Sequence, residues 1–310
     1  MQGKIVDYDD YDYKEFWSGK KRSYEHLSEI SALKKLIFKN GTKFIDIGGG
    51  YGRLSNTYIN LFPQIVILDY SLKNLSIAKK ELSKRSKSKI FFVASDVYDM
   101  PFKNSTFDFA ISIRLIHHLT QPQNFFNEIS RILTPQSLFI LEYANKRNLK
   151  RIGKFLIRKI AENPFSCKPS MIGINIYNFH PKFISNKLKL AEFKILKILS
   201  VSNFRLNFIK KVINPDILSK IDSIVQLPLG SIKTGPSIFV LSQKREEKNV
   251  LKKKDLSENT KEVPSDAEKI PWKCIYCKSD IIDEKEDELI CNQCGAKFPI
   301  IDSIYDFRKK

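Results

Sequence analysis

The hydrophobic pattern of the first half of the chain alternates between two kinds of segment. Short, nearly continuous apolar runs such as KFIDI, QIVILDY and KIFFVASD are typical of strands that are buried on both faces. Longer segments between them, such as SLKNLSIAKKELSKR and QPQNFFNEISRIL, place apolar residues at helical spacing. Strands that alternate with helices in this way predict a parallel sheet covered on both faces, which is an α/β fold.

The predicted elements follow one another at short intervals. Residues 1–40 are expected to form an aromatic arm followed by a helix that contains Leu27, Ile30 and Leu33. The strands predicted next are 43–47, 64–70, 89–96, 106–113 and 137–143. The helices predicted between them are 52–62, 71–85 and 121–133.

After Tyr143 the regular alternation ends. KRNLKRIGKFLIRKIAE predicts a basic helix, and an irregular stretch follows it. A helix (KFISNKLKLA), a strand (FKILKILSVSNF), one or two further helices and a last strand (PSIFVLSQ) complete the segment. The last two strands are expected to pair antiparallel. Residues 1–243 are therefore predicted to form one domain, within which 145–220 is a basic segment on the substrate side.

The remaining residues divide into a linker and a small module. Residues 244–270 are charged and poor in apolar groups, which predicts a linker, and residues 271–310 form a separate module. A chain of 310 residues can hold one good-sized domain and a small one. No apolar run reaches the roughly 20 residues of a membrane span, and the acidic, aromatic beginning is unlike a signal peptide, so a cytoplasmic location is expected.

The charge is strongly positive and unevenly distributed. The formal net charge is +19, which favours a polyanionic partner, either nucleic acid or anionic lipid, although a lysine-rich proteome produces the same bias. Between residues 145 and 220, 17 Lys and Arg stand against three acids. Most of the imbalance therefore lies in the basic segment.

A glycine-rich loop follows the first strand, in TKFIDIGGGYGRLS. A Walker A loop needs Gly-Lys-Ser/Thr after the glycines, and the dinucleotide fingerprint needs a glycine where this chain has Arg53. What fits is the pattern D-x-G-x-G-x-G. It is formed by Asp46, Gly48, Gly50 and Gly52, with Gly49 as an additional glycine.

This pattern resembles the first motif of class I S-adenosylmethionine-dependent methyltransferases. Glycines let the backbone approach the methionine part of that cofactor, and an acid suits its ammonium and sulfonium charges. The resemblance implies that Asp69, at the end of the second strand, accepts from the ribose hydroxyls and that Asp96, after the third strand, accepts from the adenine amino group. Tyr70 and Val97 are expected to contact the cofactor beside them.

The phrase DMPFKNSTFDFAISIRLIHHL is similar to the UbiE-like branch of this family, and the close resemblance covers about residues 37–143. It implies a Rossmann-like, doubly wound, mostly parallel sheet of seven strands, with S-adenosylmethionine across the carboxyl ends of the first strands.

Catalytic candidates lie just after the fourth strand. Methyl transfer needs a general base only if the nucleophile holds a proton that it cannot lose by itself. His117 and His118 are candidates for this base, with a structural role as the alternative, and Arg114 either binds an anionic substrate group or caps a helix. An aromatic arm either closes over the cofactor as a lid or packs outside the sheet. The arm consists of Tyr11, Tyr13, Phe16 and Trp17.

The carboxyl-terminal module contains two C-x-x-C pairs. They are formed by Cys274, Cys277, Cys291 and Cys294. Two such pairs on tight turns direct four thiolates at one tetrahedral Zn²⁺, and the metal supplies the stability that so short a module lacks. A structural zinc ribbon is therefore predicted.

The phrase LICNQCGAKFPIIDSIYDF resembles the small zinc-ribbon proteins that activate tRNA, rRNA and release-factor methyltransferases. With the basic segment, this resemblance favours RNA (tRNA or rRNA) as the substrate. One alternative is a quinone, lipid or other small molecule methylated at a membrane surface, with the basic amphipathic helix as a peripheral membrane contact. A second alternative is a non-catalytic scaffold that binds the cofactor.

Overall fold

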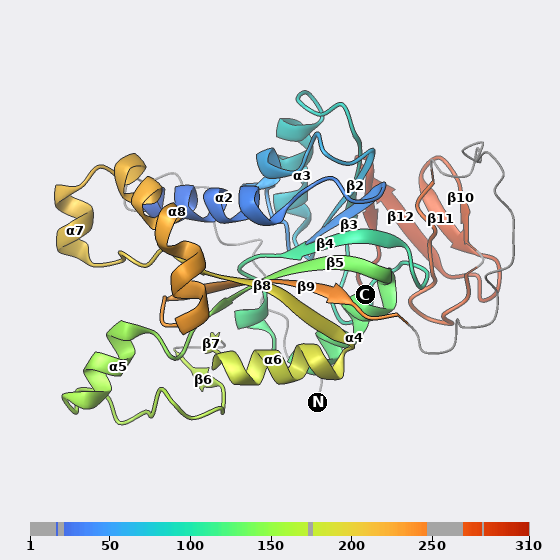
Figure 1. The fold of residues 1–310 in the computed structure, drawn as a ribbon. Helices are drawn as coiled ribbons and strands as arrows, with labels where there is room; N and C mark the ends of the chain where they lie inside the picture. The colour runs from blue at the N-terminus through green and yellow to red at the C-terminus, as the bar shows by residue number, and fades with distance from the viewer. Residues whose placement is uncertain (1–16, 18–21, 173–175, 247–268, 281, 310) are drawn as a thin grey trace, which may run out of the picture.

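The computed structural model describes residues 17, 22–172, 176–246, 269–280 and 282–309, and the fold is drawn in Figure 1. Tyr11, Tyr13 and Phe16 of the predicted arm and most of the predicted linker lie outside the described residues. The strands up to residue 244 are β1 (Lys43–Ile47), β2 (Gln64–Asp69), β3 (Lys89–Ala94), β4 (Phe107–Ser112), β5 (Leu133–Ala144), β6 (Ser170–Met171), β7 (Tyr177–Asn178), β8 (Phe193–Val201) and β9 (Ser237–Lys244). The α-helices are α2 (Ser23–Leu36), α3 (Leu72–Leu82), α4 (Pro122–Ile132), α5 (Leu149–Leu156), α6 (Pro181–Leu190), α7 (Asn207–Val212) and α8 (Pro215–Ile232).

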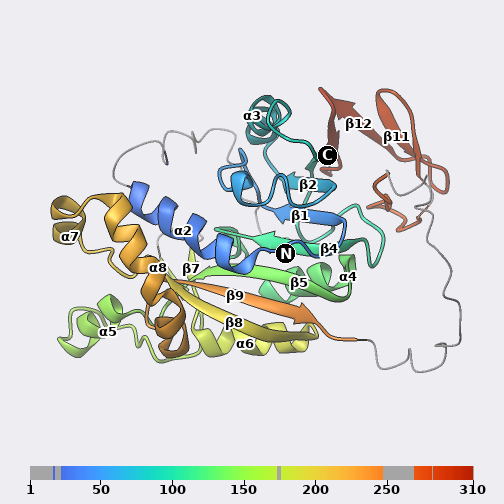
Figure 2. The ribbon, with the colours of Figure 1, turned by 45° about the horizontal axis from the view of Figure 1, so that its top comes forward.

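The central sheet has the order β3-β2-β1-β4-β5-β9-β8, and its first five strands are parallel. The seven-stranded Rossmann-like sheet expected from the resemblance is thus confirmed, and β9 pairs antiparallel with both β5 and β8, as expected for the last two strands. Helices cover both faces (Figure 2): side chains of α2 and α3 form one core with the sheet, and those of α4 and α6 form the other. The described part of the chain contains no helix long and apolar enough to cross a membrane.

The prediction of a helix over residues 52–62 is wrong. The chain there forms turns around a short 3₁₀ helix, Ser55–Thr57, whose amides bond to carbonyls three residues back. Ser, Asn and Thr in succession favour such local structure over an α-helix. The consequence is that Tyr58 turns inward and stacks on Phe44, with 4.4 Å between the ring centroids.

The carboxyl-terminal module extends the same sheet instead of standing apart. Its strands are β10 (Ile282–Glu284), β11 (Glu288–Cys291), β12 (Lys297–Ile301) and β13 (Ile304–Asp306). β13 pairs in parallel with β3, with Tyr305 opposite Val93, so the sheet has 11 strands. Trp272 is buried at this junction against Phe102 and Phe307, at centroid distances of 5.8 and 5.2 Å. The prediction of a module separate from the core is corrected in this respect.

Candidate active site and zinc centre

The glycine loop after β1 is shaped by backbone angles that other residues rarely adopt. Gly48 and Gly50 have φ of +76° and +54°. A Cβ on Gly49 would lie 2.8 Å from the Ile67 side chain, so this close approach also requires glycine. Gly52, with φ of +77°, packs against α3, where a Cβ would lie 2.8 Å from Leu82. It does not line the pocket that lies at the carboxyl ends of β1, β2 and β3.

A pocket lies at the carboxyl ends of β1, β2 and β3. It brings together the predicted cofactor residues Asp46, Gly48, Gly49, Gly50, Asp69, Tyr70, Asp96 and Val97. The Asp69 carboxylate accepts from the amides of Gly50 at 2.9 Å and Ser71 at 3.0 Å, which fixes the carboxylate at the pocket wall. The Asp96 carboxylate accepts from the Tyr98 amide at 2.9 Å, and burial raises its pKa.

Asp46 is placed differently from the other two acids. It is 4% exposed, and its carboxylate accepts a hydrogen bond from the Tyr58 hydroxyl at 2.5 Å. Burial raises the pKa of Asp46 to about 7, despite the Tyr58 hydrogen bond, which favours the charged form. A cationic ligand in the pocket would favour the ionised form, so Asp46 is suited to an electrostatic role.

Arg114 forms a structural ion pair rather than a helix cap. Its guanidinium and that of Arg53 both bind the fully buried carboxylate of Glu29, with 2.6 Å between Arg53 and Glu29. Burial raises the pKa of Glu29, but the two arginines outweigh it and lower that pKa to about 2. The Trp17 ring lies over Arg53 at 3.7 Å, and Trp17 lines the pocket. Glu29 does not line the pocket itself but holds the pocket residues Arg53 and Arg114, a role that the sequence pattern did not reveal.

The two histidines differ in position. His118 lines the pocket, whereas His117 is not among the lining residues; their ring centroids are 4.1 Å apart. Burial lowers the pKa of His118 to about 4. The pKa of His117 is also lowered, mainly by burial and to a lesser degree by the neighbouring His118 and Arg114. Both imidazoles are therefore neutral at pH 7, and of the two His118 is positioned to contact a ligand.

A second cavity, of about 1010 Å³, adjoins this site, and we call it the acceptor chamber. It is lined by residues of α2, α5, α7, the end of α8 and the loop after β8. Trp17 marks the boundary, because its ring lies 5.4 Å from both Arg114 of the pocket and Arg22 of the chamber. Arg205 also lines the chamber, and its Nε and Nη2 are buried without a hydrogen-bond partner. Sequence reasoning missed Arg205 because no motif surrounds it.

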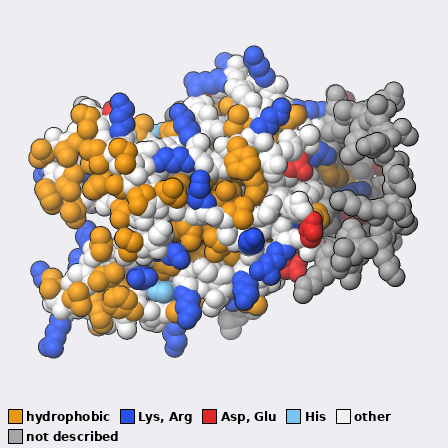
Figure 3. Space-filling model, in the orientation of Figure 1, with side chains coloured by type: hydrophobic (Ala, Val, Ile, Leu, Met, Phe, Trp, Pro, Cys, Tyr) orange, Lys and Arg blue, Asp and Glu red, His pale blue; other side chains and the backbone are white. Residues whose placement is uncertain are grey.

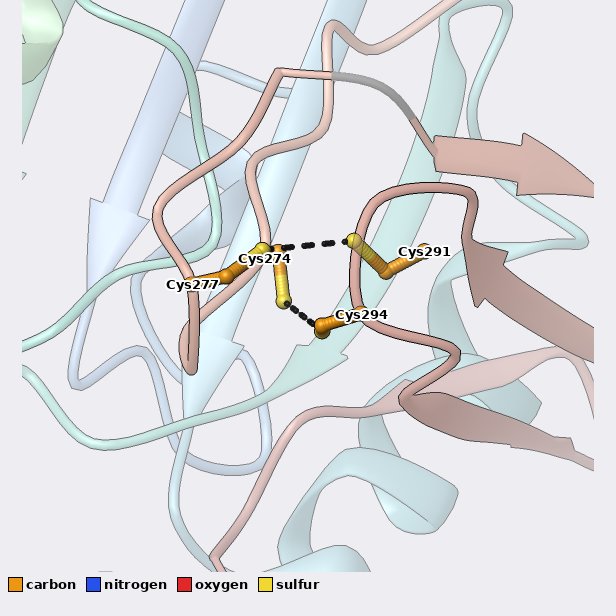
Figure 4. Close-up of side chains that lie close together, drawn as sticks. All are labelled: Cys274, Cys277, Cys291 and Cys294. Atoms are coloured by element: carbon orange, nitrogen blue, oxygen red, sulfur yellow. Dashed lines mark hydrogen bonds between the residues drawn. The ribbon is translucent and has the colours of Figure 1, made fainter.

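The four cysteines of the carboxyl-terminal module come together as predicted (Figure 4). All four Sγ atoms lie within 4.8 Å of one another, with 3.7 Å between Cys274 and Cys294 and 3.5 Å between Cys277 and Cys291. Thiolates about 2.3 Å from one tetrahedral Zn²⁺ stand about 3.8 Å apart, so the cluster fits a structural zinc ion. Gly295, with φ of +73°, allows the turn after the second pair.

The zinc module reaches the pocket from the β3 edge. The Phe307 amide donates to the Ala94 carbonyl at 2.8 Å, directly before the strand end that carries Asp96. The Arg308 guanidinium lies 5.7 Å from the centroid of the Tyr70 ring, which lines the pocket. The module therefore supports the end of the pocket formed by β2 and β3.

Comparison with known families agrees with this geometry. Residues 45–141 match the family described as a methyltransferase domain, and residues 269–300 match a family described as a zinc ribbon domain. A demethylmenaquinone methyltransferase of Chlamydia pneumoniae is 28% identical over 142 residues, which cover 41% of this chain and 60% of that protein. The uncharacterized protein MJ0638 of Methanocaldococcus jannaschii is 31% identical over 196 residues, 63% of this chain and 73% of that one. The chain belongs to the S-adenosylmethionine-dependent methyltransferases.

A structural comparison supports the fold of this methyltransferase. A chain from the complex of the Haloferax volcanii Trm112 methyltransferase activator with a protein described as a methyltransferase superposes with a TM-score of 0.53 at 14% identity. The superposition covers 78% of this chain and 99% of that one. The glycine loop, where a Cβ would clash, and the acids at the strand ends fit S-adenosylmethionine, and the cysteine cluster fits a structural zinc ion.

Proposed function

We propose that this methyltransferase transfers a methyl group to a small, lipid-soluble acceptor bound in the acceptor chamber. The observation that carries the proposal is the chamber itself, whose lining residue Arg22 lies 5.4 Å from the ring of Trp17 in the wall of the cofactor pocket. Its lining combines apolar side chains such as Leu149 and Phe204 with cationic groups such as Arg205. The demethylmenaquinone methyltransferase among the relatives supports an acceptor of the quinone class.

The expectation that the substrate is RNA gives way to this alternative. The relatives that bear a functional name include enzymes of menaquinone and ubiquinone methylation, and a chamber lined in part by apolar groups suits a small ring better than a polynucleotide. The basic charge remains compatible with an acceptor that carries an anionic or carbonyl oxygen. Arg205 would bind that oxygen, because its buried guanidinium has two donor atoms to offer.

In the proposed reaction, S-adenosylmethionine supplies a methyl group activated by its sulfonium. Asp69 would hold the ribose and Asp96 the adenine, and the glycine loop would seat the methionine part. The protein contributes mainly position and the exclusion of water. His118 is neutral at pH 7 and would accept a proton or hydrogen bond from an acceptor hydroxyl at the pocket wall.

The test is transfer of a tritiated methyl group to a cell extract that is then separated into RNA, protein and lipid fractions. The proposal predicts label in the lipid fraction; label confined to RNA would overturn it. For the acceptor that receives the tritiated methyl group, Arg205→Met should raise the KM about tenfold or more. It should leave the affinity for S-adenosylmethionine unchanged. The matched control is Arg85→Met, on the surface beyond α3, which should change neither.

A further inference from the structure

One end of the molecule exposes an unusual number of large apolar side chains. Most of those exposed in the described residues lie on α5, α7, α8 and the loops beside them. Figure 3 shows these side chains gathered where Figure 1 draws these three helices. We call this the apolar end surface: Leu149, Leu156, Ile157, Leu206, Phe208, Val212, Ile217, Ile221, Ile224 and Leu227. Scattered apolar residues are normal on a surface, but a cluster of this kind marks an interaction site.

Two of these helices bury no residue against the protein. α5 and α7 have no buried side chain, and even their apolar residues are exposed: Leu156 is 70% exposed and Val212 is 83% exposed. An amphipathic helix normally covers its apolar stripe with a neighbouring element. The apolar side chains that α5 and α7 leave exposed are therefore available to a partner outside the described residues.

The charges around the apolar end surface identify the chemistry of that partner. Exposed cationic residues accompany the apolar ones on all three helices or directly beside them: Lys150, Lys154, Arg158, Lys159, Lys211 and Lys220. Of the acids nearby, Glu162 is already paired with Lys146 and Arg151, and Asp216 is exposed at the start of α8. Apolar side chains surrounded by lysine complement an anionic bilayer, whose headgroups meet the cations while its acyl region receives the apolar groups.

We propose that the apolar end surface docks this methyltransferase onto an anionic membrane. The position of the acceptor chamber agrees with this, since its lining includes Leu149 and Lys154 of α5, Lys210 of α7 and Leu206 directly before α7. Figure 3 shows a hollow between the parts of the surface formed by α5 and α7. A lipid-soluble acceptor would pass from the bilayer into the chamber without crossing water. This step rests on the proposed function, whereas the docking does not.

The experiment is flotation of the zinc-loaded full chain with vesicles of phosphatidylcholine alone or with phosphatidylglycerol added. Binding should require the anionic lipid and weaken as salt is raised. Phe208→Ser should lower the binding constant about tenfold, because a 67% exposed ring would lose its burial in the bilayer. Its matched control is Phe38→Ser, a 50% exposed ring outside the surface, which should bind as the parent does.

A charge pair of variants completes the test. Lys211→Glu should lower anionic-vesicle binding more than tenfold, whereas Lys84→Glu, at an exposed position just after α3 and outside the apolar end surface, should change it little. Equal binding by Phe208→Ser and Phe38→Ser would overturn the proposal. So would a dimer in sedimentation velocity that Phe208→Ser abolishes, or RNA binding that the same substitution abolishes. Because flotation needs neither cofactor nor acceptor, docking without methyl transfer would refute only the proposed function.

Discussion

The junction between the zinc module and the sheet allows a quantitative test of how the chain folds. Trp272 is 5% exposed, stacks near Phe102 and Tyr305, and forms a bridge with Phe102 beside the paired strands β13 and β3. Trp272→Ala removes the largest side chain of the junction. A buried Trp replaced by Ala costs about 3–5 kcal/mol of the free energy of unfolding, because the cavity is only partly refilled.

The loss should appear in one cooperative transition, since the module and the core share a continuous sheet. At about 2.1 cal/mol/K of unfolding entropy per residue, a chain of 310 residues should lose about 5–8 °C in melting temperature. Differential scanning calorimetry of the zinc-loaded protein measures this shift. Phe208→Ala, which removes a 67% exposed ring of α7, is the control and should shift the transition by less than about 1 °C.

The reasoning would be refuted if the module melted in a separate transition and Trp272→Ala left the main transition unmoved. That result would mean that the β13–β3 pairing contributes nothing to the stability of the core.

Three further predictions concern buried charges and the metal. Glu29→Gln should destabilise the protein by about 3–5 kcal/mol in denaturant titration, because two arginines lose their carboxylate; equal stability would contradict the ion-pair account. The Glu29 contribution is fully present above its unfolded pKa and is lost as the pH falls toward 2. The contribution of Asp46 to stability depends on pH in the opposite direction: because its pKa is raised to about 7, that contribution declines as the pH rises from about 4 to 7. Asp46→Asn should therefore flatten the dependence of the free energy of unfolding on pH over that range. Removing zinc with a chelator should weaken S-adenosylmethionine binding severalfold in calorimetry, because β13 pairs with β3, whose last residue lies two positions before Asp96; unchanged affinity would show that the two sites are independent.

Much of the central sheet could be predicted because each of its strands is a short apolar run. The signals that identify such a strand lie within the run itself and in the residues directly beside it in the sequence. The positions of Asp69 and Asp96 in the pocket could also be predicted from the sequence, since parallel strands place their carboxyl ends at one edge of the sheet. The Ser71 side chain caps α3, as the residue type at that position favours.

The features that could not be predicted depend on contacts between distant residues. β13 has only three residues, and nothing in them specifies pairing with β3, more than 200 positions earlier. Glu29 resembles any surface acid of an amphipathic helix until Arg53 and Arg114 are brought beside it. Arg205 is ordinary in the sequence and becomes notable only when it is buried in the wall of the acceptor chamber.

The measurement that tests the central claim most directly is calorimetric titration of the zinc-loaded protein with S-adenosylmethionine and its demethylated product. The account predicts that both bind at one site per chain and that Asp69→Ala weakens binding about 10- to 100-fold, the cost of losing charged hydrogen bonds to the ribose. Asp280→Ala, an exposed acid of the zinc module, should bind as the parent does. Absence of binding by the folded, zinc-loaded protein, or equal affinity of the two variants, would contradict the account.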